Sequence, residues 1–173
     1  MIILEGPDNS GKSTLAEFLA SGTGIKANHS GGPIKSKADY QMRVATFFST
    51  EKVYVMDRWP SISEQVYGSV MGRSYDIEFD ETTIHALARG WLFIYCRPPL
   101  DHLMDFTKHR GSEYTAPGVT PEAYHRKIEE KQHHLVERYD EVMSHVPHIR
   151  YDFKSATPKF LSFLQASCRR FIK

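Results

Sequence analysis

The segment Gly6-Pro7-Asp8-Asn9-Ser10-Gly11-Lys12-Ser13 constrains the fold of this chain more than any other feature. It matches the pattern G-x-x-x-x-G-K-[ST] at every fixed position, follows the apolar run 1–4 and precedes a helix-compatible stretch at 14–20. A strand, a glycine-rich loop and a helix in this order form a phosphate cradle, because main-chain N–H groups at the helix N-terminus surround an anion. The alternative is a chance glycine-rich turn between two core elements. Such a turn would not explain why every fixed residue of the pattern is present, or why an apolar run precedes it and a helix-compatible stretch follows it. The sequence therefore predicts a nucleoside triphosphate site.

The residues of this loop have separate expected roles. Lys12 is expected to reach the β- and γ-phosphates, and the Ser13 hydroxyl is expected to hold Mg²⁺. The glycines permit the backbone to wrap closely around an anion. We expect the residues that contact the nucleotide to be Gly6, Asn9, Ser10, Gly11, Lys12, Ser13 and Thr14.

Length and composition limit the class of protein. A chain of 173 residues, with 40% hydrophobic and 25% charged residues, is expected to form one domain, residues 1–173, with its own core. The net charge of +1 provides no basic field for tight binding along duplex DNA, although a local basic groove is not excluded. Cys96 and Cys168 form no C-x-x-C pair, so we interpret them as small buried residues in a reducing compartment. The longest apolar run, 91–96, is too short to span a bilayer, so we expect a cytoplasmic protein without a membrane partner.

Short apolar strands alternate with amphipathic stretches along the chain. This alternation predicts an α/β fold of three layers, in which helices flank a parallel sheet of about five strands. We expect strands at Ile2–Glu5, Val53–Asp57, Leu92–Cys96 and Ile149–Asp152, and a weak fifth strand near Ile25–Ala27. We expect helices at Lys12–Ala20, Ala38–Phe48, Ser63–Met71, Glu81–Arg89, Leu100–Lys108, Pro121–His145 and Pro158–Ile172. In such a fold, ligands bind beyond the carboxyl ends of the strands.

A second informative site lies at the end of the strand Val53–Asp57. Asp57, at the tip of a buried strand near a phosphate loop, is well placed to hold Mg²⁺, and Arg58 offers a fork for a second phosphate or carboxylate. Alternatively, the two residues pair with each other or cap the next helix. Motor-type ATPases usually place Glu after this Asp, and GTPases carry N-K-x-D, but this sequence has neither pattern. Both differences favour phosphoryl transfer to a second bound substrate.

The segment from Leu4 to Thr14, together with Asp57-Arg58-Trp59, resembles the thymidylate kinase and deoxynucleoside kinase group of P-loop kinases, and most of all its small phage-type monophosphate kinases. The resemblance implies a P-loop kinase fold, ATP with Mg²⁺ as phosphoryl donor, and a small nucleotide as acceptor. It implies that Asp8 binds the 3′-hydroxyl of the acceptor sugar, that Arg58 grips its phosphate, and that Asp57 lies by the metal. Trp59 would crowd the 2′ position of the sugar and favour deoxyribose. A phage-encoded enzyme would act in the host cytoplasm, and a homodimer is left open.

The segment 107–119 resembles the lid that closes over the triphosphate in these kinases. It begins with Thr107-Lys108-His109-Arg110 and continues into a loop rich in Gly, Ser and Pro. In the thymidylate kinase family, an arginine that contacts the transferring phosphate comes from the phosphate loop or from the lid. Because Asn9 occupies the loop position, the resemblance assigns this role to the lid, with Lys108 and Arg110 as candidates. The alternative is a solvated helix C-terminus, where basic side chains favour the helix dipole.

The acceptor pocket is expected near the helix that follows Arg58. Tyr67 and Arg73 lie on or just past this helix and are the candidate contacts to the acceptor. Phe47 and Phe48 could stack on a base, but aromatic residues at helical spacing belong more often to a core, and we interpret them so.

Several further polar residues receive no firm role. Arg43 is a candidate for phosphate contact, and Arg97 could approach the nucleotide or pair with Asp101. The histidines show no metal-binding motif, and His133-His134 is expected on a solvated surface.

These residues predict an ATP-dependent kinase that transfers the γ-phosphoryl group to a deoxynucleoside monophosphate. Catalysis is assigned to Lys12, Asp57, Arg58 and Arg110, through positioning and electrostatic stabilisation. A monophosphate is favoured because it arrives as an anion whose charge must be neutralised, whereas a nucleoside hydroxyl needs a base. The alternatives are a deoxynucleoside kinase with Asp57 as base, a kinase acting on a hydroxyl of modified DNA, and a nucleotide-binding module without activity. The base of the acceptor is not assigned.

Overall fold

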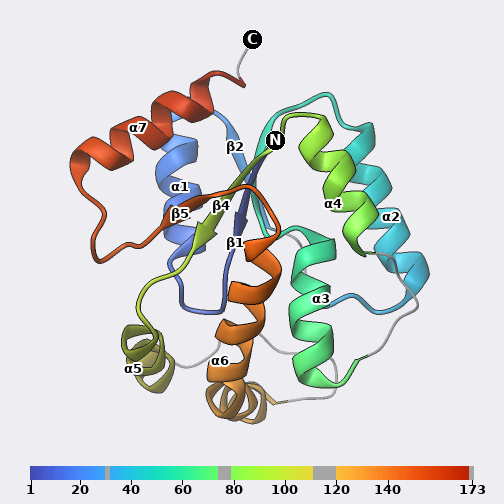
Figure 1. Ribbon diagram of the computed structural model, residues 1–173, viewed down its shortest axis with the longest axis vertical. Coiled ribbons are helices and arrows are strands. Elements are labelled where there is room, and N and C mark those ends of the chain that lie inside the picture. The colour runs from blue at the N-terminus through green and yellow to red at the C-terminus, as the bar shows by residue number, and fades with distance from the viewer. Residues whose placement is uncertain (30–31, 74–78, 111–119, 172–173) are drawn as a thin grey trace.

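The computed structural model describes residues 1–29, 32–73, 79–110 and 120–171. Each strand is followed by one or two helices, and a parallel sheet forms the middle of three layers (Figure 1). No helix within the described ranges is long and apolar enough to cross a bilayer. In chain order the elements are β1 (Ile2–Glu5), α1 (Lys12–Thr23), β2 (Lys26–His29), α2 (Lys37–Ser49), β3 (Tyr54–Asp57), α3 (Pro60–Met71), α4 (Phe79–Ala88), β4 (Leu92–Cys96), α5 (Leu100–Arg110), α6 (Pro121–Ser144), β5 (Ile149–Tyr151) and α7 (Pro158–Arg169).

The sheet has the strand order β2-β3-β1-β4-β5, and all its pairs are parallel. The central strand β1 is fully buried and pairs Leu4 with Asp57 of β3 and Glu5 with Tyr95 of β4. The two strands lie on opposite sides of β1, so the connections that leave their carboxyl ends diverge there. This is the point of an α/β sheet at which ligands bind.

Helices cover both faces of the sheet (Figure 1). On one face, α1 and α7 pack on side chains that include Leu4, Val55 and Ile94. On the other face, α2, α3, α4 and α6 enclose a larger core that contains Ile3 and Met56. Neighbouring residues of each strand thus enter opposite cores, as the pleat of a strand requires.

The predicted three-layer α/β fold with a five-stranded parallel sheet is confirmed. The strands at Ile2–Glu5 and Leu92–Cys96 have the predicted bounds, and the weak fifth strand exists at Lys26–His29. It pairs with β3 at the edge of the sheet, where its side chains are largely exposed. This exposure explains why its apolar signal is weak.

The described helices agree with the predicted helices in their order along the chain and in their approximate positions, and they differ at their ends. The threonines before α6 and α7 cap them as expected: Thr120 accepts from the Ala123 amide at 3.3 Å, and Thr157 accepts from the Phe160 amide at 3.2 Å. The helix α3 begins at Pro60 rather than at Ser63. Proline suits the first helical position because its fixed φ is already helical and its missing N–H is not needed there.

Trp59 belongs to the core, which corrects the expectation that it contacts the acceptor sugar. Its side chain is fully buried. The indole ring packs at 5.7 Å from Phe47, 5.8 Å from Phe48 and 5.4 Å from Trp91, measured between ring centroids, and its N–H donates to Thr83 at 3.2 Å. The interpretation of Phe47 and Phe48 as core residues agrees with these contacts.

Replacing Trp59 with alanine is expected to lower the free energy of unfolding by about 3–5 kcal/mol, because it leaves a large cavity among aromatic rings. Denaturant unfolding measures the change. Phe163→Ala is the matched control: its ring is 54% exposed, so its loss should cost less than about 1 kcal/mol. Equal losses in the two variants would contradict the core position of Trp59.

Candidate active site

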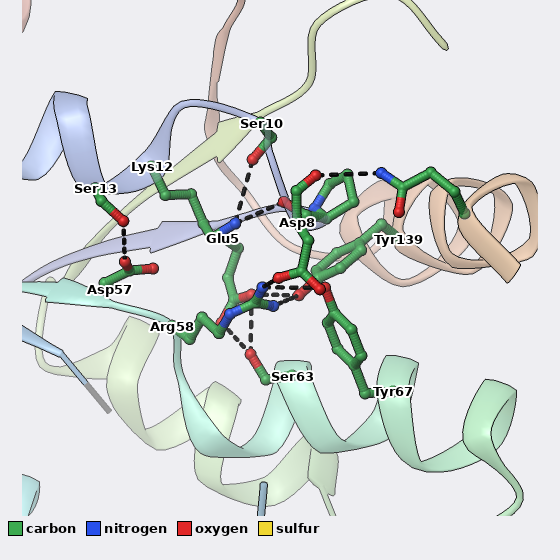
Figure 2. A network of polar contacts seen from close by, with 12 residues as sticks. Glu5, Asp8, Ser10, Lys12, Ser13, Asp57, Arg58, Ser63, Tyr67 and Tyr139 are labelled. Carbon is green, nitrogen blue, oxygen red and sulfur yellow. Dashed lines mark hydrogen bonds and ion pairs between the residues drawn. The ribbon is translucent and has the colours of Figure 1, made fainter. Parts of the chain in front are cut away.

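The loop between β1 and α1 places a buried ammonium group at the carboxyl edge of the sheet. Gly6, Asn9 and Gly11 adopt positive φ angles of 145°, 63° and 83°, which turn the backbone around the Lys12 side chain. The Lys12 Nζ donates to the Pro7 carbonyl at 2.6 Å and to the Ser10 hydroxyl at 3.3 Å (Figure 2). Burial, and then the nearby Arg58 charge, lower the pKa of Lys12. An anion bound in this loop would therefore lie beside a positive charge that has little contact with water.

Gly6 fixes the loop against the end of β4. A Cβ atom on Gly6 would lie 2.3 Å from the Cys96 carbonyl oxygen, which is part of the backbone and cannot move aside alone. Only glycine permits both this approach and a φ of 145°. Glycine at position 6 therefore allows the loop to pack directly against the end of β4.

The structure brings Ser13 and Asp57 together, as the predicted metal site requires. The Ser13 hydroxyl donates to Asp57 Oδ2 at 2.9 Å (Figure 2), and His29 Nδ1 lies 3.2 Å from the same oxygen. Asp57 Oδ1 is buried and has no hydrogen-bond partner among the described residues. Burial acts to raise the pKa of Asp57, but the charges of Lys12 and Arg58 outweigh it and hold this pKa below its usual value. An ionised carboxylate with one unpaired oxygen beside a hydroxyl suits a hard divalent cation.

Arg58 lies at the opposite side of the loop with its guanidinium group fully engaged. Nη2 donates to Asp8 Oδ1 at 2.5 Å and to the Tyr67 hydroxyl at 3.0 Å, while Nη1 donates to the Tyr139 hydroxyl at 2.8 Å (Figure 2). The guanidinium carbon also lies 4.6 Å from the centre of the Tyr67 ring. Burial acts to lower the pKa of Arg58, but Tyr67, Tyr139 and Asp8 raise it well above its usual value. The predicted alternative, a direct Asp57–Arg58 pair, is thus replaced by an Asp8–Arg58 pair.

Glu5 and Tyr139 complete this cluster, and neither was predicted as a site residue. The Glu5 carboxylate is fully buried and accepts from the Trp59 amide, from the Tyr139 hydroxyl at 3.1 Å and from the Ser63 hydroxyl at 3.3 Å (Figure 2). Burial raises the pKa of Glu5 to about 7. A charged residue at the end of a buried apolar strand is the sequence signal that could have revealed Glu5. Tyr139 lies within the helix expected at Pro121–His145, for which no site role was predicted.

Gln132 links α6 to the loop. Its amide nitrogen donates to the Asp8 carbonyl oxygen at 3.1 Å, and its side chain is fully buried. Asp8 therefore contacts α6 through its backbone and Arg58 through its carboxylate. No sequence pattern pointed to this contact, because the two residues lie 124 positions apart.

The other predicted site residues have different surroundings. Arg73 pairs with Glu64 of α3, with its Nε 2.9 Å from Glu64 Oε1. Arg43 pairs with Asp39 at 3.0 Å. Arg97 pairs with Asp140 of α6 at 2.9 Å, which corrects the suggested pairing with Asp101.

The predicted lid lies largely outside the described residues. Residues 111–119 are not described, and Lys108 and Arg110 are described only as part of the α5 backbone. Their assignment to the transferring phosphate stays a prediction. Thr14 follows Ser13 in the first turn of α1, and its side chain is exposed.

His133 and His134 on α6 lie on the surface, as expected, and they group with a carboxylate. His133, His134 and Glu137 are exposed, and their potential ligand atoms lie within 4.8 Å of one another. Each imidazole Nδ1 lies 3.4 Å from a Glu137 oxygen. A motif search misses this group because adjacent histidines do not form a standard metal-binding spacing.

A pocket of about 650 Å³ lies between the β4–α5 and β5–α7 connections. Its walls include Arg97, Leu100, Arg150, Asp152, Ser155 and Phe160. Phe153, the residue after Asp152, lies close to the loop: a Cβ atom on Gly11 would lie 3.1 Å from its ring. The β5–α7 connection thus contributes residues both to the pocket and to the contact with the loop.

Comparison with solved structures identifies the fold. YorR from Bacillus subtilis, determined in complex with phosphorylated GDP, has a TM-score of 0.70 and 18% identity, over 99% of this chain and 94% of that chain. Deoxyadenosine kinase from M. mycoides, determined with dCMP and a flexible dCDP, has a TM-score of 0.58 and 15% identity, over 99% of both chains. Polyphosphate kinase 2 from Arthrobacter aurescens TC1 has a TM-score of 0.63 and 11% identity, over 99% of this chain and 66% of that chain. No protein-family model and no curated protein matches the sequence. The chain thus has the fold of P-loop kinases.

Replacing Gly6 with alanine is expected to weaken triphosphate binding more than about tenfold, because the added methyl group would push the loop away from β4. Titration with a fluorescent ATP analogue measures the change. Gly24→Ala is the control: Gly24 also has a positive φ, of 76°, but no atom lies within 4 Å of an added Cβ. This variant should lose stability through backbone strain and keep its affinity. Unchanged binding in Gly6→Ala would contradict the role of the loop.

Proposed function

We propose that this protein is an ATP-dependent kinase that transfers the γ-phosphoryl group to a deoxynucleoside monophosphate. The observation that carries the proposal is the presence of two cations, Lys12 and Arg58, on two sides of one loop at the carboxyl edge of the sheet. A hydrolase needs one anion site, whereas a transferase between two nucleotides needs two. Asp8 belongs to the loop and also contacts Arg58, so the two sites are adjacent.

The donor would bind along the loop. The Lys12 ammonium group would neutralise the terminal phosphates in place of its present contacts with Pro7 and Ser10. The pocket beside Phe153 has room for the rest of the nucleotide. Its mixture of charged and aromatic walls offers both a stacking surface and polar contacts.

Mg²⁺ fits the pair formed by Ser13 and Asp57. Both supply oxygen, and the unpaired Asp57 Oδ1 has an unsatisfied acceptor position. The cation would supply charge neutralisation between donor phosphates, while Ser13 and Asp57 hold it at the edge of β3. Lys108 and Arg110 of the predicted lid would add further positive charge.

The acceptor would bind at Arg58. Its guanidinium group is only partly exposed, and an anion that replaces the Asp8 carboxylate would preserve its charge balance. The released Asp8 carboxylate could then accept a hydrogen bond from a sugar hydroxyl. Tyr67 lies against the guanidinium group, so it would line the same site. The nucleotides bound by YorR and by deoxyadenosine kinase support small nucleotides as ligands.

A deoxynucleoside kinase is the second candidate, because one of the structural neighbours is a deoxyadenosine kinase. In that reaction Asp57 would take the proton of the 5′-hydroxyl. Its lowered pKa makes it a weaker base, which favours the monophosphate. A panel of nucleosides, nucleoside monophosphates and DNA, each incubated with ATP and Mg²⁺, distinguishes the candidates by ADP release. Release with nucleosides alone would refute the monophosphate proposal.

Replacing Arg58 with alanine is expected to raise KM for the monophosphate by about 10–100-fold, the value of a hydrogen bond to a charged group. The KM for ATP should change less than about threefold, since ATP would bind on the Lys12 side of the loop. Steady-state kinetics with each substrate varied in turn measures both constants. Arg170→Ala, which removes an exposed positive charge at the end of α7, is the control. Equal changes in both constants would contradict the assignment.

Replacing Lys12 with alanine is expected to abolish turnover while the fold is kept, because Lys12 would stabilise the transferring phosphoryl group. Circular dichroism and thermal unfolding verify the fold, and ADP release measures turnover. Turnover at the wild-type rate would exclude a catalytic role for Lys12.

A further inference from the structure

The buried Glu5 carboxylate contacts the backbone next to Arg58 and, through the Tyr139 hydroxyl, the Arg58 side chain. We propose that Glu5, acting through the Tyr139 hydroxyl, is a positioning residue that aims the Arg58 guanidinium group at the acceptor anion. The inference rests on the proposed function for the identity of that anion. It adds two residues that would not touch either substrate.

The first connection between Glu5 and Arg58 runs through the backbone. The Arg58 φ angle is 81°, a conformation that costs energy in a residue with a side chain. Two hydrogen bonds bracket this residue: the Arg58 amide donates to the Leu4 carbonyl at 2.9 Å, and the Trp59 amide donates to Glu5 Oε1. Because both acceptors belong to the end of β1, they hold the peptide groups on either side of Arg58 against the sheet.

The Glu5 carboxylate also accepts hydrogen bonds at the N-terminus of α3. Trp59 is the N-cap residue of this helix and provides no capping side chain. The Ser63 hydroxyl lies 3.4 Å from Glu5 Oε1 and 3.3 Å from Glu5 Oε2. A negative charge at a helix N-terminus is favourable, so ionised Glu5 stabilises the geometry in which α3 leaves Arg58.

The second connection runs through Tyr139. Its hydroxyl donates to Glu5 Oε2 at 3.1 Å and accepts from Arg58 Nη1 at 2.8 Å (Figure 2). In such a chain each hydrogen bond polarises the next, so the carboxylate strengthens the hold of the phenol on the guanidinium group. Tyr139 itself is fully buried, between Tyr95 and Tyr67, with ring centroids 6.0 Å away on each side. The phenol is therefore a fixed support.

This arrangement divides the guanidinium group into two edges. Nη1 is held by the fixed Tyr139, whereas Nη2 contacts Asp8 on the loop and Tyr67. The Asp8 carboxylate is about a third exposed, at 32%, so it is the partner that an incoming anion can replace. During that exchange Nη1 would keep its partner, and the direction of Arg58 would stay the same.

Protonation of Glu5 would provide a signature of this role. The charged groups that face Glu5 are Arg58 from the β3–α3 connection and Lys12 from α1, while Tyr139 from α6 and Cys96 from β4 contribute neutral groups. Burial raises the pKa of Glu5 to about 7, so the carboxylate is ionised above this pH and neutral below it. Its hold on Tyr139 is thus present at high pH and lost as the pH falls through about 7.

Tyr139→Phe and Glu5→Gln test the proposal against Tyr95→Phe. Tyr95 stacks on Tyr139, but its hydroxyl donates to Asp140, outside the cluster. Tyr139→Phe is expected to raise KM for the monophosphate about 5–50-fold and to change KM for ATP less than about twofold, with Tyr95→Phe near wild type. Equal changes in both constants would overturn the proposal.

The pH profile gives an independent test. In the wild type, kcat/KM for the acceptor should fall below about pH 7, and Glu5→Gln should remove this limb, since glutamine does not titrate there. Titration of the substrates affects the two pH profiles equally, because the wild type and Glu5→Gln are assayed with the same acceptor. An unchanged limb in Glu5→Gln refutes the proposal. If Glu5→Gln does not fold, the KM comparison of Tyr139→Phe decides alone.

Failure of the proposed function is recognised separately. It would appear as no ADP release by the wild type with any monophosphate. In that case, NMR of the Arg58 guanidinium N–H groups still tests the positioning role. Faster exchange of these protons with water in Tyr139→Phe than in Tyr95→Phe supports it, and equal rates overturn it.

Discussion

The parallel pairing of β1 with β3 is the constraint on which the rest of the site depends. It places Leu4 beside Asp57, so the residues that follow each strand meet at one edge of the sheet. Three carboxylates, Glu5, Asp8 and Asp57, and two cations, Lys12 and Arg58, gather there; Glu5, Lys12 and Asp57 are buried, and Asp8 and Arg58 are partly exposed. Charges removed from water are costly unless they are paired and hydrogen-bonded, so each must find a partner in the others or in a ligand. The cluster is stable as a set and not as separate pairs.

Local sequence was sufficient to predict the loop between β1 and α1, because its geometry depends on neighbours in the chain. The pattern from Gly6 to Ser13 contains the turn, the helix start and the lysine, and the structure has all three in the predicted order. The direction of Trp59 was predicted wrongly for an equally local reason. The left-handed conformation of Arg58, at φ 81°, turns the next side chain into the core. Alternation along a strand does not reveal such a residue, and the resemblance to known kinases placed the aromatic ring at the sugar.

The contributions of α6 required tertiary structure. The helix itself was expected at Pro121–His145, and its residues Ile128, Leu135 and Tyr139 are buried. A helix prediction does not say which polar atoms the buried face brings into the core. Buried tyrosine hydroxyls need a partner, and only the fold could supply the identity of the partner of Tyr139. Glu5, 134 residues earlier, is that contact.

Asp8 joins the two proposed anion sites, and the division of its contacts explains how one site could change without the other. Its carbonyl oxygen is held by Gln132, a fully buried residue, while its carboxylate contacts the guanidinium group of Arg58. Rotation of the Asp8 side chain would release Arg58 without disturbing the bond to Gln132. Because Gln132 and Tyr139 lie on the same face of α6, one rigid helix supports the loop on one side and Arg58 on the other. In the proposed reaction, exchange of the Asp8 carboxylate for an acceptor anion would therefore need only a movement of the Asp8 side chain, and the backbone would keep the distance between the two sites.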